Sequence, residues 1–403
     1  MKTLTQLVEQ QVHRSARARV RNCTQPGVVW NILESEMSAF LTDVLQQKLR
    51  QERDEILGRA PYERSADGPR RNGSKIVRLK GIFSAFRLRR PVLRGKTPAS
   101  PILEAFKRLG SGIVGLLASR FWLRGTATRA VAQEINDAFG TKLSASDVSK
   151  FTETILPDVQ AWLNRPVPQE IRYLFIDALY IPVRRPGFTS KQALLVALGV
   201  TESGHRQVLG FLLGDKESLD SWTALLKDLL ARGLNRDRLA LVISDDHKAI
   251  RSAVDQVLGV AHQLCVVHKM RNALVRVGRQ HRTAFYHDFT AVYWAESKDQ
   301  ALLALGRLQA TWNKIYPKAV QTAEADAEHF LRFMEQPKSL WTSLRSTNII
   351  ERFNRELRRR LDSAGAMHSE NELWKLVWAV GFEQEKRWEH RRVRGAKELA
   401  LAA

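Results

Sequence analysis

The sequence YLFIDALYI, at residues 173–181, places a single carboxylate, Asp177, inside an otherwise apolar run. Such a run is typical of a strand that is buried on both faces of a sheet. A carboxylate in that position is costly to remove from water unless it is paired or bound to a cation. The stretch therefore predicts a buried strand and, within it, a candidate functional residue.

The segments that follow predict the rest of an α/β sheet. Apolar runs at 192–199 and 207–213, joined by a short turn, predict two more strands. Residues 218–232 have the apolar spacing of a helix, 239–244 are expected to form a strand, and 246–258 another helix. Three strands in succession followed by helix, strand and helix describe an α/β sheet with an antiparallel edge.

Two more acidic residues join Asp177 in one constellation. Asp245 directly follows the strand predicted at 239–244, at the end where ligand-facing residues of α/β sheets gather. Glu351 lies on the polar stripe of a predicted amphipathic helix. Each has a plainer interpretation, because a strand-end Asp often caps the next helix and a surface Glu pairs readily with a residue such as Arg355.

Two Asp and one Glu suit Mg²⁺, a hard cation that prefers oxygen ligands and keeps waters for substrate phosphates. Two such ions activate a water or a 3′-hydroxyl and stabilise the leaving oxygen of a phosphoryl displacement. We therefore expect Mg²⁺ as the cofactor, with Mn²⁺ able to substitute. This chemistry requires no His or Cys nucleophile.

The composition bounds the class of protein. With 403 residues the chain exceeds what one hydrophobic core normally supports, so we expect two or three folded units. It has 64 Lys and Arg against 42 Asp and Glu, a net charge of +22 and a pI near 10.4. Solubility alone needs a much smaller excess, so the charge indicates a polyanionic partner, with nucleic acid the leading candidate.

The sequence favours an intracellular protein. Two cysteines cannot build a disulfide scaffold, which fits a reducing compartment. The N-terminus has no continuous apolar segment of signal-peptide length, and the longest apolar stretches, such as 193–200, are too short to cross a membrane. We expect a soluble protein with no membrane partner.

Positive charge is dense in the N-terminal part. Residues 1–60 have helical spacing, 61–72 predict a polar linker, and 70–96 hold ten Lys or Arg and no acidic residue. Alternation within 76–89 predicts short strands with a basic face, for which simple solvation is the plainer alternative. The side chains expected to contact phosphates are Arg70, Arg71, Lys75, Arg78, Lys80, Arg87, Arg89 and Arg90.

Residues 121–155 have the pattern of two helices joined by a short turn. Thr128 is expected to cap the first helix, and Ser144 and Asp147 to form a capping box for the second. This is the pattern of a DNA-binding helix-turn-helix, although ordinary helix pairs share it. The second helix, expected at 146–156, is the candidate for reading bases in a groove.

Several motifs occur along the chain in a fixed order. They are RNG at 71–73, LRG at 123–125, WLNRP at 162–166, LFIDALY at 174–180, SD at 244–245, CVVHKMRN at 265–272 and STNIIERFNR at 346–355. Together they resemble the motifs of Mutator-type bacterial insertion-sequence transposases, the insertion-sequence 256 family. The likeness extends from about residue 70 to the C-terminus.

The resemblance implies an α/β ribonuclease-H-like catalytic core with an all-helical insertion, preceded by a mostly helical DNA-binding N-terminal region. It implies a DDE triad of Asp177, Asp245 and Glu351, in agreement with the constellation above. Asp245, rather than the adjacent Asp246, matches the Ser-Asp step of the family. The expected divisions are a basic DNA-binding region at 1–110, a helix-turn-helix-like module at 111–165, a catalytic core at 166–265 and 341–403, and a helical insertion at 266–340.

Cys265 and His268 also match a family element. No second pair of ligands is visible, so a zinc site is the weaker interpretation, and we expect the two side chains to support the fold near the active site. Further phosphate contacts are expected from Lys269, Arg271, Arg352, Arg355 and Arg358. The expected insertion carries Trp294 and Trp312, and Trp341 follows it directly; for all three, core packing is the main interpretation and base stacking the alternative.

The leading hypothesis is a DNA transposase that binds terminal inverted repeats in double-stranded DNA, cleaves the ends and joins the free 3′-hydroxyl to target DNA. Two alternatives are a catalytically silent, transposase-derived DNA-binding protein and a ribonuclease-H-like nuclease of RNA–DNA hybrids. Joining two ends requires a synaptic complex, so we expect a homodimer. The resemblance implies a cytoplasmic, nucleoid-associated bacterial protein.

Overall fold

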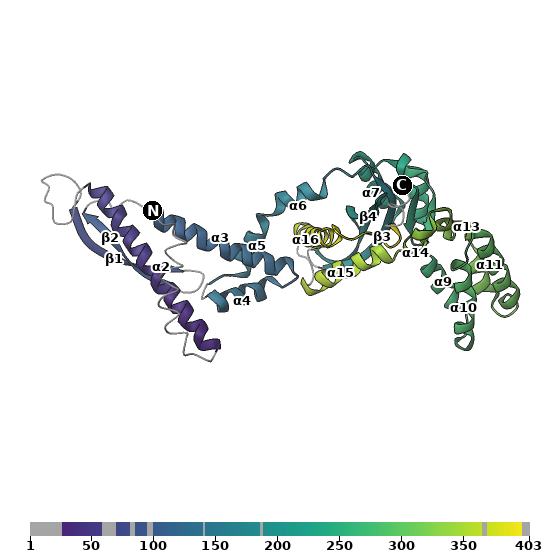
Figure 1. Cartoon of the computed structure of the whole chain (residues 1–403), viewed down its shortest axis with the longest axis horizontal. Helices are drawn as coiled ribbons and strands as arrows, with labels where there is room; N and C mark the ends of the chain where they lie inside the picture. Colours follow the sequence, from purple (N-terminus) through teal and green to yellow (C-terminus); the bar gives the residue numbers. More distant parts are fainter. Residues whose placement is uncertain are drawn as a thin grey trace. The chain divides into compact units, whose positions relative to one another are not determined.

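The structure is a computed structural model, which describes residues 26–58, 70–80, 85–94, 100–139, 142–185, 188–364 and 369–396 (Figure 1). The chain divides into two compact units. The first holds residues 1–122 and 126–154, and the second holds 123–125 and 155–403. The division at residue 154 lies before the boundary expected at residue 165.

The described residues of the first unit form a long helix, a β-hairpin and three further helices. Leu45 and Leu49 of the long helix pack with Leu88 of the hairpin and with Leu103. The Gln46 side-chain amide bonds both backbone groups of Arg89, donating at 2.7 Å and accepting at 2.9 Å. The elements are α2 (Pro26–Leu57), β1 (Arg70–Lys80), β2 (Ala85–Arg94), α3 (Pro101–Leu123), α4 (Thr128–Phe139) and α5 (Ala145–Glu153).

The hairpin differs from the expected linker boundary. Strand β1 begins at Arg70, so residues 70–72 belong to the sheet, while residues 61–69 of the expected linker lie outside the described residues. The register between β1 and β2 shifts after Arg71, where Gly73 has a φ of 77°. A glycine tolerates that left-handed conformation, which suits a β-bulge.

The helix pair α4 and α5 forms as the capping signals predicted, with two corrections. Ser144 and Asp147 make the reciprocal capping box at the start of α5. Thr128 is inside α4 rather than at its cap, because the Val131 N–H donates to the Ala127 carbonyl. The helix expected at 146–156 ends at Glu153, and a separate helix, α6 (Leu156–Leu163), begins with a proline in its first turn.

The second unit is built on one five-stranded mixed sheet. Its order is β5-β4-β3-β6-β7, with β3, β4 and β5 antiparallel and β3, β6 and β7 parallel. The mixed α/β class and the antiparallel edge predicted from the sequence are confirmed. The strands are β3 (Ile171–Arg185), β4 (Phe188–Thr201), β5 (Arg206–Gly214), β6 (Leu241–Ser244) and β7 (His262–Leu264).

Side chains alternate across β3 and divide the core into two layers. Leu174 and Ile176 share one buried cluster with Trp222 of α7 (Leu219–Ala231) and Ile250 of α8 (Lys248–Ala253), which a π-helical turn, η2 (Val254–Leu258), extends. The opposite face meets α15 (Asn348–Ala364) at β3, and α16 (Glu370–Trp388) at β5. Asp177 lies on that second face, with Phe175.

Glu385 of α16 binds residues near the N-terminal start of the second unit. Its carboxylate accepts from the Trp162 indole at 3.2 Å and the Val208 N–H at 3.0 Å, and it pairs with Arg165. Trp162 and Arg165 belong to the WLNRP motif, and the Arg165 guanidinium also lies over the Trp162 ring. These contacts explain why residues 155–165 belong to the second unit.

The described residues between β7 and α15 are helices and turns. The buried Gln263 side chain ties β7 to them, donating to the Phe330 carbonyl and accepting from the Phe333 N–H. The helices are α9 (Val266–Leu274), α10 (Arg282–Tyr293), α11 (Lys298–Trp312), α12 (Pro317–Glu324), α13 (Ala327–Phe330) and α14 (Trp341–Leu344). The short 3₁₀ turns of this segment are η3 (Arg279–His281), η4 (Arg332–Glu335) and η5 (Lys338–Leu340); a further one, η1 (Arg236–Arg238), precedes β6.

The three tryptophans differ in environment. Trp312 is buried and donates to Asp288, and Trp341 donates to the Gln336 carbonyl, so both support the helical packing. Trp294 is 60% exposed, with the Arg345 guanidinium 3.8 Å from its ring centroid. No helix among the described residues is long and apolar enough to cross a membrane.

The layer formed by α7 provides a test of the core. We expect Leu225→Ala, at a fully buried position, to destabilise the second unit by about 2–5 kcal/mol, because the cavity cannot collapse completely. Leu219→Ala, on the same helix but 36% exposed, is the matched control and should change stability by about 0.5 kcal/mol or less. Denaturant unfolding followed by circular dichroism measures both, and equal effects would contradict the assigned layer.

Candidate active site

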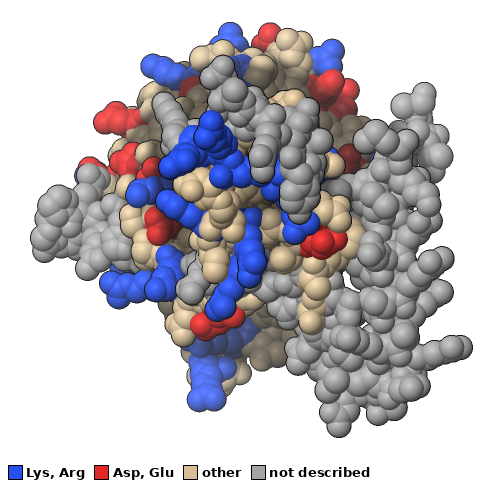
Figure 2. Space-filling model, turned by 90° about the vertical axis from the view of Figure 1, so that its left-hand side faces the viewer, with Lys and Arg blue, Asp and Glu red and all other residues tan. Residues whose placement is uncertain are grey.

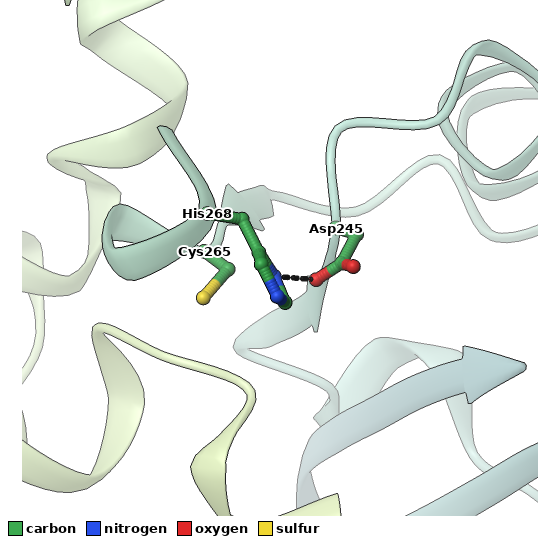
Figure 3. A group of neighbouring side chains, drawn as sticks. All are labelled: Asp245, Cys265 and His268. Carbon is green, nitrogen blue, oxygen red and sulfur yellow. Dashed lines mark ion pairs between the residues drawn. The ribbon is translucent and has the colours of Figure 1, made fainter. Parts of the chain in front are cut away.

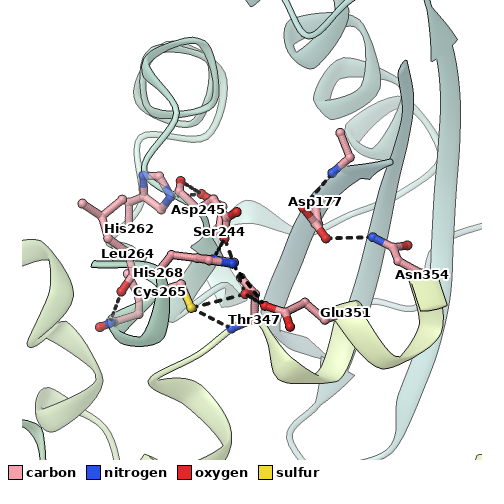
Figure 4. A network of polar contacts seen from close by, with 12 residues as sticks. Asp177, Ser244, Asp245, His262, Leu264, Cys265, His268, Thr347, Glu351 and Asn354 are labelled. Atoms are coloured by element: carbon pink, nitrogen blue, oxygen red, sulfur yellow. Dashed lines mark hydrogen bonds and ion pairs between the residues drawn. The ribbon is translucent and has the colours of Figure 1, made fainter. Parts of the chain in front are cut away.

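Asp177 lies in the middle of β3 and is held by two donors. Its Oδ1 accepts from the Ala178 N–H at 2.9 Å, and its Oδ2 accepts from the Asn354 side chain of α15 at 2.8 Å (Figure 4). Burial, together with the nearby carboxylates of Asp245 and Glu351, raises the pKa of Asp177 to about 7, although the two hydrogen bonds oppose the shift. The residue is thus a buried carboxyl group in the field of two other acids.

Asp245 and Glu351 meet through a threonine and a histidine. Helix α15 begins directly after the buried Thr347, and Glu351 lies in its first turn. The Thr347 hydroxyl donates to Glu351 Oε1 at 2.8 Å and lies 3.5 Å from Asp245 Oδ1. His268 of α9 pairs with Asp245 through Nδ1, and its Nε2 is 3.6 Å from Glu351 Oε1.

Cys265 and His268 form the wall of the site next to Asp245 (Figure 3). The hydrogen bond to Asp245, with a second to Cys265, raises the pKa of His268 to about 10, so its imidazole is a cation near neutral pH. The buried Cys265 thiol lies within hydrogen-bond distance of the Thr347 backbone N–H and hydroxyl, at 3.4 and 3.3 Å. Figure 4 shows this network linking α9, the end of β6 and α15.

The carboxylates offer the donor set that a hard divalent cation prefers. Asp177, Asp245 and Glu351 supply only oxygens. Burial and the charges of the other two acids raise the pKa of Asp177, and a bound cation would stabilise its charged form. In donor type these residues therefore fit Mg²⁺ and Mn²⁺, although the oxygens of the three carboxylates do not all lie within 4.8 Å of one another. The constellation comes from β3, the end of β6 and α15, which lie far apart in the sequence.

A second donor group overlaps the first at Asp245. Ligand atoms of Asp245, Cys265 and His268 lie within 4.8 Å of one another. Their types suit zinc, but a closed structural zinc site has four protein ligands, and among the described residues this group has three. The contacts of Cys265 with Thr347 favour the interpretation that Cys265 and His268 support the fold beside the acidic site.

Asp246 belongs to a separate ionic cluster that sequence reasoning missed. It pairs with Arg251 at 3.2 Å and with Lys269 at 3.5 Å, and both cations also reach Asp326, at 2.9 and 3.5 Å. Asp326 has a φ of 60°, a left-handed conformation that Asp tolerates better than most residues. The adjacent Asp245 and Asp246 thus have different partners.

This cluster corrects the expectation for Lys269. Its side chain is 4% exposed and lies against two carboxylates, so it stabilises the fold and is not available to DNA phosphates. Arg271, two residues later on α9, is exposed. Helical geometry explains the difference, because residues two apart on a helix point in different directions.

The arginines of α15 also divide into two groups. Arg352, Arg355 and Arg358 are exposed, as a phosphate-contacting role requires. Arg360 is 5% exposed, donates to the Leu123 carbonyl and pairs with Glu383 at 2.7 Å, so it is a structural residue rather than part of a basic patch.

The hairpin of the first unit concentrates like charges. Across the strands, Arg70 is opposite Arg94, Lys75 opposite Arg90, and Arg78 opposite Arg87. Like charges directly opposite in a sheet are destabilising, and a polyanion bound there would remove the penalty. Figure 2, which views the end of the chain that carries β1 and β2, shows many Lys and Arg side chains. The described side chains of Arg70, Arg71, Lys75, Arg87 and Arg89 are exposed, and that of Arg90 is partly exposed.

Comparison with known proteins assigns the chain to a family. A model described as transposase, Mutator family, matches residues 24–391, and the chain therefore belongs to the Mutator family of transposases. The transposase for insertion sequence element ISRM5 of Rhizobium meliloti (strain 1021) is 30% identical over 370 residues, covering 91% of this chain and 92% of the relative. The resemblance inferred from the motifs is confirmed.

Other relatives have the same kind of name. The transposase for insertion sequence element IS406 of Burkholderia multivorans is 32% identical, covering 84% of this chain and 87% of the relative. That of IS256 from Staphylococcus aureus is 27% identical, covering 90% and 94%. A solved chain of a simian T-cell lymphotropic virus intasome matches at 12% identity and a TM-score of 0.18, covering 51% of this chain and 63% of that one, a score too low to bear on the fold.

Replacing Lys269 separates stability from DNA contact. We expect Lys269→Met to destabilise the second unit by about 1–3 kcal/mol, because it removes a partner from two carboxylates, and to leave DNA affinity unchanged. Arg271→Met, on the exposed side of α9, should weaken DNA binding with little change in stability. Thermal unfolding and fluorescence anisotropy with duplex DNA measure the two effects, and weaker DNA binding by folded Lys269→Met would refute the correction.

Buried His262 predicts a loss of stability in acid. Its Nε2 contacts the Ser244 hydroxyl at 2.8 Å, and burial, with the nearby His329 and Arg251, lowers the pKa of His262 from 6.5 to about 4. In the unfolded chain the His262 imidazole binds a proton more readily than in the folded chain. The free energy of unfolding therefore falls as the pH drops below about 6.5, by about 3 kcal/mol in total once the pH is below 4. His262→Gln should remove this part of the pH dependence in denaturant titrations, and parallel curves for the two proteins would contradict it.

Proposed function

We propose that the protein is a DDE transposase that binds terminal inverted repeats, cleaves DNA at the ends and transfers the 3′-hydroxyl to target DNA. The observation that carries the proposal is the convergence of Asp177, Asp245 and Glu351 in one site of a Mutator-family chain. The strand order, with three antiparallel strands followed by two parallel ones and a helical segment before the Glu, supports a ribonuclease-H-like core with a helical insertion.

The three carboxylates would hold Mg²⁺ or Mn²⁺. Bound there, the metal supplies Lewis-acid activation of a water or 3′-hydroxyl and stabilisation of the leaving oxygen. The chain's own residues prepare the site: His268 orients Asp245, and Thr347 orients Glu351. Arg352 and Arg355, exposed on the helix that carries Glu351, would position the phosphates of the DNA ends.

Removing any one acid tests the triad. We expect Asp177→Asn, Asp245→Asn and Glu351→Gln each to reduce Mg²⁺-dependent cleavage and joining to background, because each removes an anionic oxygen ligand while keeping the shape of the side chain. Binding to inverted-repeat DNA should persist. Asp246→Asn is the matched control and should retain activity, since its carboxylate pairs with Arg251 and Lys269. Joining by purified protein lacking one of the three acids would rule out the assignment.

The same assay separates the alternatives. A catalytically silent DNA-binding protein would bind the ends without cutting them in Mg²⁺ or Mn²⁺. A ribonuclease-H-like nuclease would prefer RNA–DNA hybrid to duplex DNA. We propose a homodimer as the smallest complex that joins two ends, and a complex of one chain with both ends would exclude it.

The first unit is proposed to recognise the ends. Residues 1–154 carry 27 basic and 14 acidic residues, over half of the excess charge of the chain. The hairpin would contact phosphates, which set the register, and the exposed face of α5 would enter a groove to read bases. Both elements lie in the compact unit that ends at residue 154.

A fragment of residues 1–154 tests this division of labour. It omits Trp162 and Arg165, whose partner Glu385 lies in the second unit. We expect it to prefer inverted-repeat DNA over random duplex, with an affinity that falls steeply as salt rises, because phosphate contacts release counterions. The remainder, from residue 155, should bind weakly and without preference. Equal affinity of the fragment for both duplexes, by anisotropy, would place recognition elsewhere.

A further inference from the structure

Asn354 occupies an unusual place in the active site. It lies on α15 one turn after Glu351, it is 6% exposed, and its Nδ2 donates to Asp177 Oδ2 at 2.8 Å. Figure 4 shows Glu351 and Asn354 projecting from the same helix, with Asn354 aimed at Asp177. A single helix therefore carries one acid of the triad and the side chain that holds another.

The contact determines how the Asp177 carboxylate is oriented. The Ala178 N–H holds Oδ1, but that bond alone leaves the plane of the carboxylate free to turn about it. The bond from Asn354 to Oδ2 supplies the second fixed point. With both points held, the remaining lone pairs of Asp177 face a defined direction, which is the condition for binding a cation with strict ligand geometry.

Packing does not account for an amide at this position. The apolar neighbours Ile350, Phe353 and Leu357 are buried at 0–1% exposure and anchor α15 on the sheet. The Asn354 Oδ1 is buried without a hydrogen-bond partner, which costs about 1–3 kcal/mol. An apolar side chain of the same size would avoid that cost, so the asparagine is explained by what its Nδ2 does.

We propose that Asn354 is a positioning residue that orients Asp177 for binding the divalent cation. This inference rests on the proposed function, because it assigns to Asp177 the role of metal ligand. It makes metal binding depend on the seating of α15: a shift of the helix moves Glu351 and releases Asp177 together.

The test replaces the donor without removing the bulk. Asn354→Leu keeps the number and branching of the side-chain heavy atoms and loses the N–H, and Asn354→Ala is the second variant if leucine prevents folding. Asp362→Ala, at an exposed position of the same helix, is the control. Circular dichroism establishes folding, and two titrations with Mg²⁺ and with Mn²⁺ follow: the rise in melting temperature, and the rate of DNA-end cleavage.

We expect the half-saturating Mg²⁺ concentration to rise by about 10- to 100-fold in the Asn354 variants, as is usual when a partner of a metal ligand is lost. The rate at saturating metal should recover in large part, and the melting shift at a fixed Mg²⁺ concentration should shrink. The Asp362→Ala control should match the wild-type chain in both titrations.

Two outcomes would overturn the proposal. A folded variant whose half-saturating concentration and melting shift stay within about twofold of wild type would show that Asn354 has only a structural role, while the proposed function stands. A wild-type chain that neither cleaves DNA nor is stabilised by metal would remove the proposed function and this inference together. If the wild-type chain binds metal without cleaving, the melting shift alone decides the role of Asn354.

Discussion

The active site of the second unit depends on one carboxylate, Asp177, that is buried in a strand with two other acids nearby. Burial, together with the charges of Asp245 and Glu351, raises the pKa of Asp177 to about 7. The surroundings supply the compensation that a buried acid needs. Hydrogen bonds from Ala178 and Asn354 reach Asp177, the His268 cation reaches Asp245, and the Thr347 hydroxyl reaches Glu351.

Helix α15 combines this compensation with ordinary packing. Its apolar stripe is buried against the sheet, which fixes the height of the helix above β3. The positions of its polar residues at the site are thereby fixed, and Glu351 contacts Thr347 while Asn354 contacts Asp177. The exposed Arg352 and Arg355 lie on the side turned to solvent. The apolar face of this amphipathic helix therefore stabilises the fold, and its polar face carries the residues of the site.

The positively charged residues of the chain fall into two groups with different surroundings. In the hairpin of the first unit, like charges stand opposite one another across the strands, an arrangement that favours an anionic partner. In the second unit, Lys269 and Arg360 are buried and paired with carboxylates, and they hold helices together. Net charge thus indicates the kind of partner, while individual contacts decide which cations remain available to it.

The sequence by itself determined the described strands except the short β7, the capping box at Ser144 and the family, because apolar periodicity, local capping and ordered motifs are read along the chain. It also singled out Asp177, Asp245 and Glu351 as a candidate set, since an acid inside an apolar strand is costly. Only the tertiary structure decided that Lys269 is buried, that Asp246 is neutralised by Arg251, and that Asn354 reaches Asp177 from 177 residues away. These depend on which faces of distant elements meet, and burial and pairing across the core leave no local pattern from which to infer them.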